Sequence, residues 1–171
     1  MEDKIKKYID LALSMKAEHA VAVGVDEIVF DGRTILKCMF GCSDWNKGCT
    51  CPSRERFPWP WEFEKLLRRY KTVIIIHSHD KHIAQDISFT LEREAFFDGD
   101  ALAFSMSDCS LCEQCAGLVG EECRNITKAR PAFHSVGIDV FATVKKLGLP
   151  LSTLKSRDET QNWYSAVWLN E

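Results

Sequence analysis

Apolar positions follow two different periods along the chain and predict helices interspersed with strands. Ile5, Tyr8, Ile9, Ala12 and Met15 recur at helical spacing and predict an amphipathic helix over residues 3–17. The same spacing predicts three further helices: one begins near Pro60, one spans 86–98 and one follows Asp139. Asp139 is a residue type that is typical of an N-cap.

β-Branched and aromatic runs predict strands over 19–25, 72–76, 101–106 and 164–169. The run 72–76 lacks polar alternation, which indicates a strand buried on both faces. Residues 28–30 and 34–39 flank Asp31-Gly32, a turn signal, and predict a hairpin.

These elements predict one domain over residues 1–171, of the α/β or α+β class, with a central sheet flanked by helices. A chain of 171 residues is long enough to bury a core of its own. Two cysteine-rich loops, 38–52 and 109–123, are expected at the ends of strands, where loops carry function on a rigid support.

Composition and charge indicate neither a nucleic-acid partner nor a membrane-spanning segment. The net charge is −3, from 22 basic and 25 acidic residues, and no basic stripe indicates a nucleic-acid partner. The chain has no apolar run of about 18 residues, so no membrane-spanning helix is expected. Met1-Glu2-Asp3-Lys4-Ile5 does not resemble a secretory signal, and the expected location is the cytoplasm.

Eight cysteines are the strongest chemical signal in the chain. In a reducing compartment, cysteines at this density are more typical of metal ligands than of disulfides. The second group, Cys109, Cys112 and Cys115 at two-residue intervals, matches the first three ligands of a ferredoxin-type [4Fe-4S] loop, and Cys123 follows seven residues later. Zinc is the competing interpretation, because two cysteine pairs can also surround one ion.

The first group has wider spacing. Cys38, Cys42 and Cys51 are its three candidate ligands, and Cys49 either completes a set of four or is a spectator. Three ligands on a four-iron cluster would leave one iron open as a Lewis acid, and the two groups could also exchange ligands. These alternatives stay open at the level of sequence.

Two other features are weaker candidates. Arg130 could donate hydrogen bonds to a cofactor's sulfur atoms or bind an anionic substrate, and a structural salt bridge is the competing interpretation. The cluster of histidines at 77, 79 and 82 is better explained as a strand that ends in a polar loop than as a metal site.

Several motifs together resemble the prokaryotic "predicted metal-binding protein" family, a domain of unknown function. The resemblance runs from about residue 34 onward and includes, in chain order, Cys38-x3-Cys42, Cys51-Pro52, the four cysteines of the second group, Ala129-Arg130-Pro131 and Gly137-Ile138-Asp139-Val140. It implies seven metal-ligand cysteines, with Cys49 extra. Ser53 and His134 depart from the residues usual in the family, Pro and Glu respectively.

The favoured function is an iron–sulfur protein with one or two [4Fe-4S] clusters, used for electron transfer or cluster-based redox chemistry. A redox partner protein would then be expected. The alternative is a module in which zinc is structural and no catalysis occurs. No glycine-rich nucleotide-binding fingerprint is present, and whether the chain is an enzyme is left open.

Overall fold

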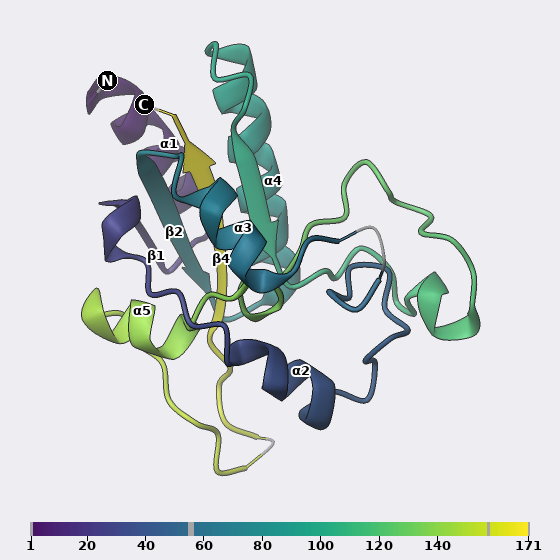
Figure 1. The fold of residues 1–171 in the computed structure, drawn as a ribbon. Helices are drawn as coiled ribbons and strands as arrows, with labels where there is room; N and C mark the ends of the chain where they lie inside the picture. The colour runs from purple at the N-terminus through teal and green to yellow at the C-terminus, as the bar shows by residue number, and fades with distance from the viewer. Residues whose placement is uncertain (1, 55–56, 157, 171) are drawn as a thin grey trace.

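The computed structural model describes residues 2–54, 57–156 and 158–170 (Figure 1). The described residues form five α-helices and one four-stranded sheet, an α+β arrangement that confirms the expected fold class. The α-helices are α1 (Glu2–Ser14), α2 (Thr34–Gly41), α3 (Pro60–Leu67), α4 (Lys81–Phe97) and α5 (Val140–Lys146). The strands are β1 (His19–Gly24), β2 (Thr72–Ser78), β3 (Phe104–Ser107) and β4 (Trp163–Leu169).

The sheet has the strand order β1-β2-β4-β3, and every neighbouring pair is antiparallel. In the central pair of strands, β2 and β4, Ile75 lies opposite Ala166. On the other edge of β2, Ile75 lies opposite Val21 of β1. Six of the seven residues in β2 are buried, as its unbroken apolar run predicts.

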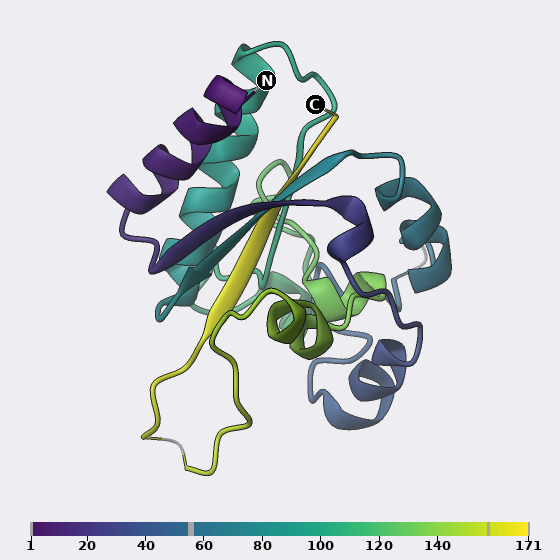
Figure 2. The ribbon, with the colours of Figure 1, turned by 90° about the vertical axis from the view of Figure 1, so that its left-hand side faces the viewer.

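Helices cover both faces of the sheet, which explains why its central strands lack polar alternation (Figure 2). On one face, Ile74, Ile76 and Val167 pack against α1 and α4. On the opposite face, Val73, Ile75 and Trp168 pack against α3, α5 and the short 3₁₀ helix η3 (Phe133–Val136). Successive side chains of one strand therefore enter two separate cores.

The predicted hairpin over 28–39 is wrong. Residues 34–39 lie in helix α2, because Ile35 and Cys38, three positions apart, are the buried positions rather than alternating ones. Asp31 starts the turn before α2 by accepting hydrogen bonds from the Arg33 backbone and side chain. Phe30 instead forms an isolated antiparallel bridge with Ile138. The first cysteine group thus begins in a helix, whereas the second follows strand β3 as predicted.

Two other elements begin with clear capping signals. The Asp139 carboxylate accepts a hydrogen bond from the Ala142 amide at 2.9 Å, which confirms the predicted N-cap of α5. Helix α4 begins at Lys81 rather than at residue 86, because the Asp80 carboxylate accepts hydrogen bonds from the amides of His82 and Ile83.

Backbone contacts bring the two cysteine-bearing segments to one end of the sheet. The amide of Ser107, at the end of β3, donates to Pro131 at 3.1 Å, so the second cysteine loop leaves and returns at the same point. The amide of Asp31 donates to Gly137 at 2.7 Å, which ties the start of α2 to the segment after η3. Residues 42–54 and 108–131 consequently lie side by side (Figure 1).

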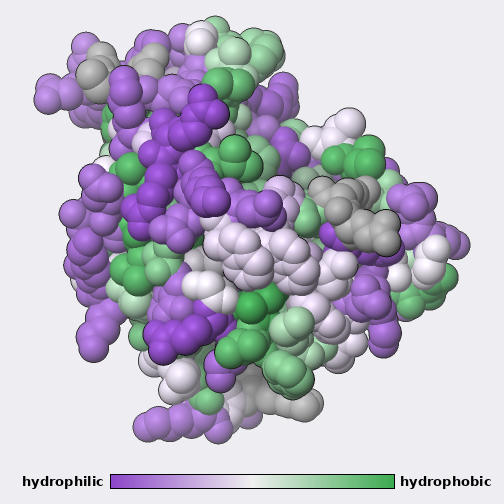
Figure 3. All heavy atoms as spheres, viewed as in Figure 1, coloured by the Kyte–Doolittle hydropathy of each residue, from purple (hydrophilic) through white to green (hydrophobic). Residues whose placement is uncertain are grey.

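Polar residues cover much of the face seen in Figure 3, with apolar patches between them. Within the described ranges, no helix combines the length and apolar character needed to cross a membrane.

Candidate metal centre

One cavity at this end of the sheet is lined by all eight cysteines. Its volume is about 240 Å³. The cysteines that line it are Cys38, Cys42, Cys49, Cys51, Cys109, Cys112, Cys115 and Cys123. The fold therefore joins two groups that are almost sixty residues apart in sequence, and every cysteine predicted as a ligand reaches the same space.

The thiols that influence one another fall into two sets. Burial, together with the charges of Cys42 and Cys51, raises the pKa of the Cys38 thiol to about 11. Cys49 interacts instead with Cys115 and Cys123. These interactions define a set of three, Cys38, Cys42 and Cys51, and relate Cys49 to the second group.

Cys49 reaches the second group because the two cysteine loops touch at Gly117. Gly117 lies in the 3₁₀ helix η2 (Ala116–Val119), directly after Cys115 and Ala116. A Cβ at Gly117 would lie 2.3 Å from the carbonyl oxygen of Lys47 and 3.0 Å from the Cys49 Sγ. Only glycine allows this approach, which buries Cys49 and sets it beside Cys115.

Amide donors surround the sulfur atoms of the second group. The side-chain amide of Asn125 donates to Cys112 Sγ at 3.1 Å, and the backbone amide of Cys49 donates to Cys115 Sγ at 3.5 Å. Burial opposes ionisation of Cys115, but backbone donors from Cys49, Gly117 and Leu118 outweigh it and lower the pKa of this thiol. Such donors stabilise the thiolate form that binds metal.

Cys109 lies at the start of the second loop, next to strand β3. Burial raises the pKa of its thiol, while the backbone amide of Leu111 and the side chain of Gln85 act in the opposite direction. Gln85 is a buried residue of α4, and its Oε1 accepts hydrogen bonds from the amide and hydroxyl of Ser110. Helix α4 thereby fixes the beginning of the loop that carries Cys109.

The set of three has fewer such contacts. Cys38 is buried on α2, Cys42 follows the end of that helix and is exposed, and Cys51 is half-buried. The Cys51 Sγ lies 3.0 Å from the Ser53 hydroxyl, the residue that stands where the family usually has proline. A thiolate at Cys51 would accept a hydrogen bond from this hydroxyl.

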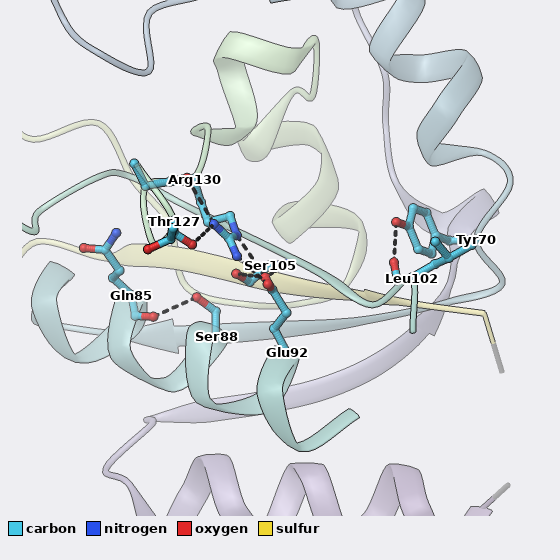
Figure 4. Close-up of polar contacts among 9 residues, drawn as sticks. Tyr70, Gln85, Ser88, Glu92, Leu102, Ser105, Thr127 and Arg130 are labelled. Atoms are coloured by element: carbon cyan, nitrogen blue, oxygen red, sulfur yellow. Dashed lines mark hydrogen bonds and ion pairs between the residues drawn. The ribbon is translucent and has the colours of Figure 1, made fainter. Parts of the chain in front are cut away.

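Arg130 does not line the cysteine cavity. Its guanidinium forms a bidentate ion pair with Glu92 of α4, with Nε 2.9 Å from Oε2, and both side chains are about 15% exposed (Figure 4). Glu92 also accepts a hydrogen bond from the backbone amide of Ser105 at 2.6 Å. The observed role matches the salt-bridge interpretation, and cofactor binding by Arg130 stays a prediction.

His77, at the end of β2, links His19 and Asn162 in a hydrogen-bonded chain. His77 is buried, its Nδ1 lies 3.0 Å from His19 Nδ1, and its Nε2 lies 2.8 Å from Asn162 Oδ1. Because the Asn162 oxygen can only accept, His77 carries its proton on Nε2 and accepts from His19 at Nδ1. This arrangement agrees with the interpretation of His77 as a structural residue.

Sequence reasoning missed several residues that line the cysteine cavity, among them Asp108, Asn125 and His134. Burial raises the pKa of the Asp108 carboxyl, and the charges of His134 and Lys81 oppose that shift. The position of Asp108 directly before Cys109 was the available signal. His134 had none beyond its departure from the family pattern, because its proximity depends on the packing of η3.

The donor set fits a metal cofactor held by sulfur. Eight thiols, several with N–H donors aimed at them, surround one space, which is the chemistry of a thiolate-ligated cluster. Within the described residues, no three His, Cys, Asp or Glu side chains are arranged to hold a single metal ion.

The fold and this cavity define an α+β protein with a cysteine-lined candidate metal site. The model of the family of predicted metal-binding proteins, DUF2284, matches residues 22–169, so the chain belongs to that family. Comparison with curated proteins and with solved structures gave no match.

Proposed function

We propose that this protein is an iron–sulfur protein that carries one or two [4Fe-4S] clusters in the cysteine cavity and uses them for electron transfer or cluster-based redox chemistry. The observation that carries the proposal is that all eight thiols line one cavity of about 240 Å³. When bound, such a cluster supplies one-electron redox chemistry whose potential depends on hydrogen bonds to its sulfur atoms and on solvent exposure.

The second group would hold a cluster with four ligands. Cys109, Cys112, Cys115 and Cys123 have the loop spacing of a [4Fe-4S] site, and donors from Asn125 and Cys49 support two of these sulfurs. A closed set of four ligands suits an electron relay. Cys49 contacts Cys115 and is a candidate donor to that sulfur or an additional ligand.

The set of three would hold metal with one position open. Cys38, Cys42 and Cys51 line the same cavity, and the charges that act on the Cys38 thiol come from Cys42, Cys51 and Asp108. An open position would allow a substrate to bind the metal as to a Lewis acid. Electrons would then pass from a redox partner protein through the second group to chemistry at the first.

Structural zinc is the alternative. Four sulfurs around zinc lie about 2.3 Å from the ion and therefore roughly 3.8 Å from one another. Eight thiols line the cavity, twice the four that one structural zinc ion uses, and this number favours a cluster over a single ion. Zinc would contribute folding free energy and leave no open position for a substrate.

Metal content and absorption of protein purified without oxygen test the proposal. We expect iron and acid-labile sulfide in equal amounts, with a broad visible band that bleaches on reduction. A content of about eight irons per chain would mean that both sets of cysteines bind a cluster, and about four would mean that one set does. A folded, colourless protein that holds only zinc, and that binds no iron on anaerobic reconstitution, would overturn it.

Two triple variants assign the metal to its ligands. Replacement of Cys109, Cys112 and Cys115 by serine should remove the relay cluster, and replacement of Cys38, Cys42 and Cys51 should remove the metal with the open position. If two clusters are bound, each triple variant should lose about half of the iron. Complete loss of iron in both variants would mean that the two sets share one cluster.

A further inference from the structure

A second cavity lies beside the metal centre and is lined mainly by apolar and aromatic side chains. Its volume is about 450 Å³, within the range of about 300–1,000 Å³ typical of sites for small molecules. Its apolar wall is formed by Phe133, Val140, Phe141, Leu151, Trp163 and Tyr164. These residues come from η3, α5, the segment after α5 and strand β4.

Two residues line both cavities. Asp108 and His134 belong to the wall of the cysteine cavity and to the wall of the second cavity. Asp108 directly precedes Cys109, and its charge influences the Cys38 thiol. The two cavities therefore adjoin at a polar partition, Asp108 and His134, and a molecule bound in the second cavity would lie next to the candidate metal centre.

Strand β4 holds part of the wall rigid. The Tyr164 hydroxyl donates to the carbonyl oxygen of Pro150 at 2.6 Å, and its ring stacks on His77 with centroids 4.9 Å apart. The Asn162 oxygen is bound to His77 Nε2, which fixes the Asn162 amide at the wall of the cavity. Tyr164 thus offers its ring rather than its hydroxyl, and Asn162 is a preorganised polar group.

The charges around the cavity restrict its ligand. Among the described residues that line it, none is lysine or arginine, and Lys81 stands behind the wall with its Nζ 6.0 Å from the centroid of the Trp163 ring. The wall itself therefore offers a phosphate or carboxylate group no lysine or arginine to pair with, and it carries the acidic Asp108. The ionisable groups at the partition are an acid and an imidazole, Asp108 and His134. A flat apolar ring with one polar substituent directed at this partition matches both the apolar wall and the polar end.

We propose that this second cavity binds a small, uncharged organic molecule with an aromatic or conjugated ring and a hydroxyl or carbonyl group, with the polar group against Asp108 and His134. Its role as the substrate site of the metal centre rests on the proposed function. Binding itself does not depend on the metal, because the apolar wall contains no cysteine.

Titration with 2-naphthol tests the proposal. Protein purified without oxygen should bind this probe saturably, measured by equilibrium dialysis and by saturation-transfer NMR. The anionic analogue 2-naphthalenesulfonate should bind at least about tenfold more weakly, because its sulfonate would meet the acidic Asp108 and no lysine or arginine among the described residues of the wall. Equal binding of the two probes, or no saturable binding of 2-naphthol, would overturn the proposal.

Matched variants locate the binding site. Phe141 and Phe97 are both exposed phenylalanines, but only Phe141 lines the cavity. Phe141→Ser should weaken 2-naphthol binding by at least about fivefold through loss of an aromatic contact, and Leu154→Ser, also in the wall, should weaken it too. Phe97→Ser should leave the affinity unchanged. Similar affinities of F141S and F97S would contradict the proposed site.

Two further readouts separate the alternatives. Iron measured on the same samples distinguishes the proposals: binding without iron would contradict the proposed function alone, and iron without binding would contradict the cavity proposal alone.

Sedimentation velocity tests whether a second copy of the chain covers Phe141 instead. We expect F141S and the unmodified protein to have the same oligomeric state, and a dimer that dissociates in F141S would overturn the small-molecule assignment.

Discussion

At the scale of single residues, the groups around the cysteines determine what the cavity can bind. Buried Cys38 and Cys49 are held as thiols, with the pKa of each raised to about 11, whereas N–H donors lower the pKa of Cys115. These differences arise from burial and donor placement rather than from residue type. Metal binding would release protons from the raised thiols, so metal affinity should increase with pH.

If the second group holds the proposed cluster, Asn125→Leu should make that cluster harder to reduce. The Asn125 amide donates to Cys112 Sγ at 3.1 Å, and a donor to sulfur stabilises the more negative, reduced state. If that preference is about 1 kcal/mol, its loss lowers the potential by about 40 mV. A redox titration followed by EPR measures this shift, and Gln114→Leu, at an exposed position of the same loop, is the control expected to show none.

At the scale of elements, the contact between the two loops places Cys49 beside the second group. Gly117→Ala would set a Cβ against the Lys47 backbone, force the loops apart and lower the iron content of the protein. Gly41→Ala is the matched control, because a Cβ at Gly41 meets nothing within 4 Å although that residue also lies between two cysteines. Equal iron content in the two variants would show that the loop contact is not needed for metal binding.

The Arg130–Glu92 ion pair joins the end of the second loop to α4 and to β3. Glu92→Gln would leave a mostly buried guanidinium without its partner and should cost about 2 to 3 kcal/mol of unfolding free energy. Glu121→Gln removes a solvent-exposed pair with Arg124 and should cost less than about 1 kcal/mol. Urea unfolding of both variants measures the difference, and equal losses would argue against a structural role for the Arg130 pair.

At the scale of the whole molecule, stability should fall when the solution is acidified through the range of histidine titration. Burial lowers the pKa of His77, with His19 and His79 adding to this effect, while the unfolded chain keeps a value of about 6.5. The unfolded state therefore binds more protons below that pH, and stability is lost as the pH falls from about 6.5 towards the lower folded value.

His77→Gln should flatten this pH dependence. Urea unfolding measured between pH 7.5 and 5.5, roughly one unit on either side of the unfolded histidine pKa, gives the slope. The variant will be less stable at every pH, so the slope rather than the stability itself is diagnostic. His82→Gln, at an exposed position of α4, is the control and should keep the slope of the unmodified protein.

The sequence by itself determined the features that depend on local spacing. Residues within a few positions of one another predict the buried strand β2 and the Asp139 cap. Local spacing of the cysteines likewise indicates metal ligands. The prediction of residues 34–39 as a strand failed because a short apolar segment suits either period, and packing of Ile35 and Cys38 selected the helix.

Only the tertiary structure decided how the cysteines are divided and what lies beside them. Cys49 joins Cys115 across a separation of 66 residues, and Asp108 and His134 form the partition between two cavities. Arg130 pairs with Glu92 of α4, a partner that its place in the sequence does not indicate. Such contacts depend on how helices and loops pack around the sheet, and local sequence spacing carries no information about residues brought together from distant parts of the chain.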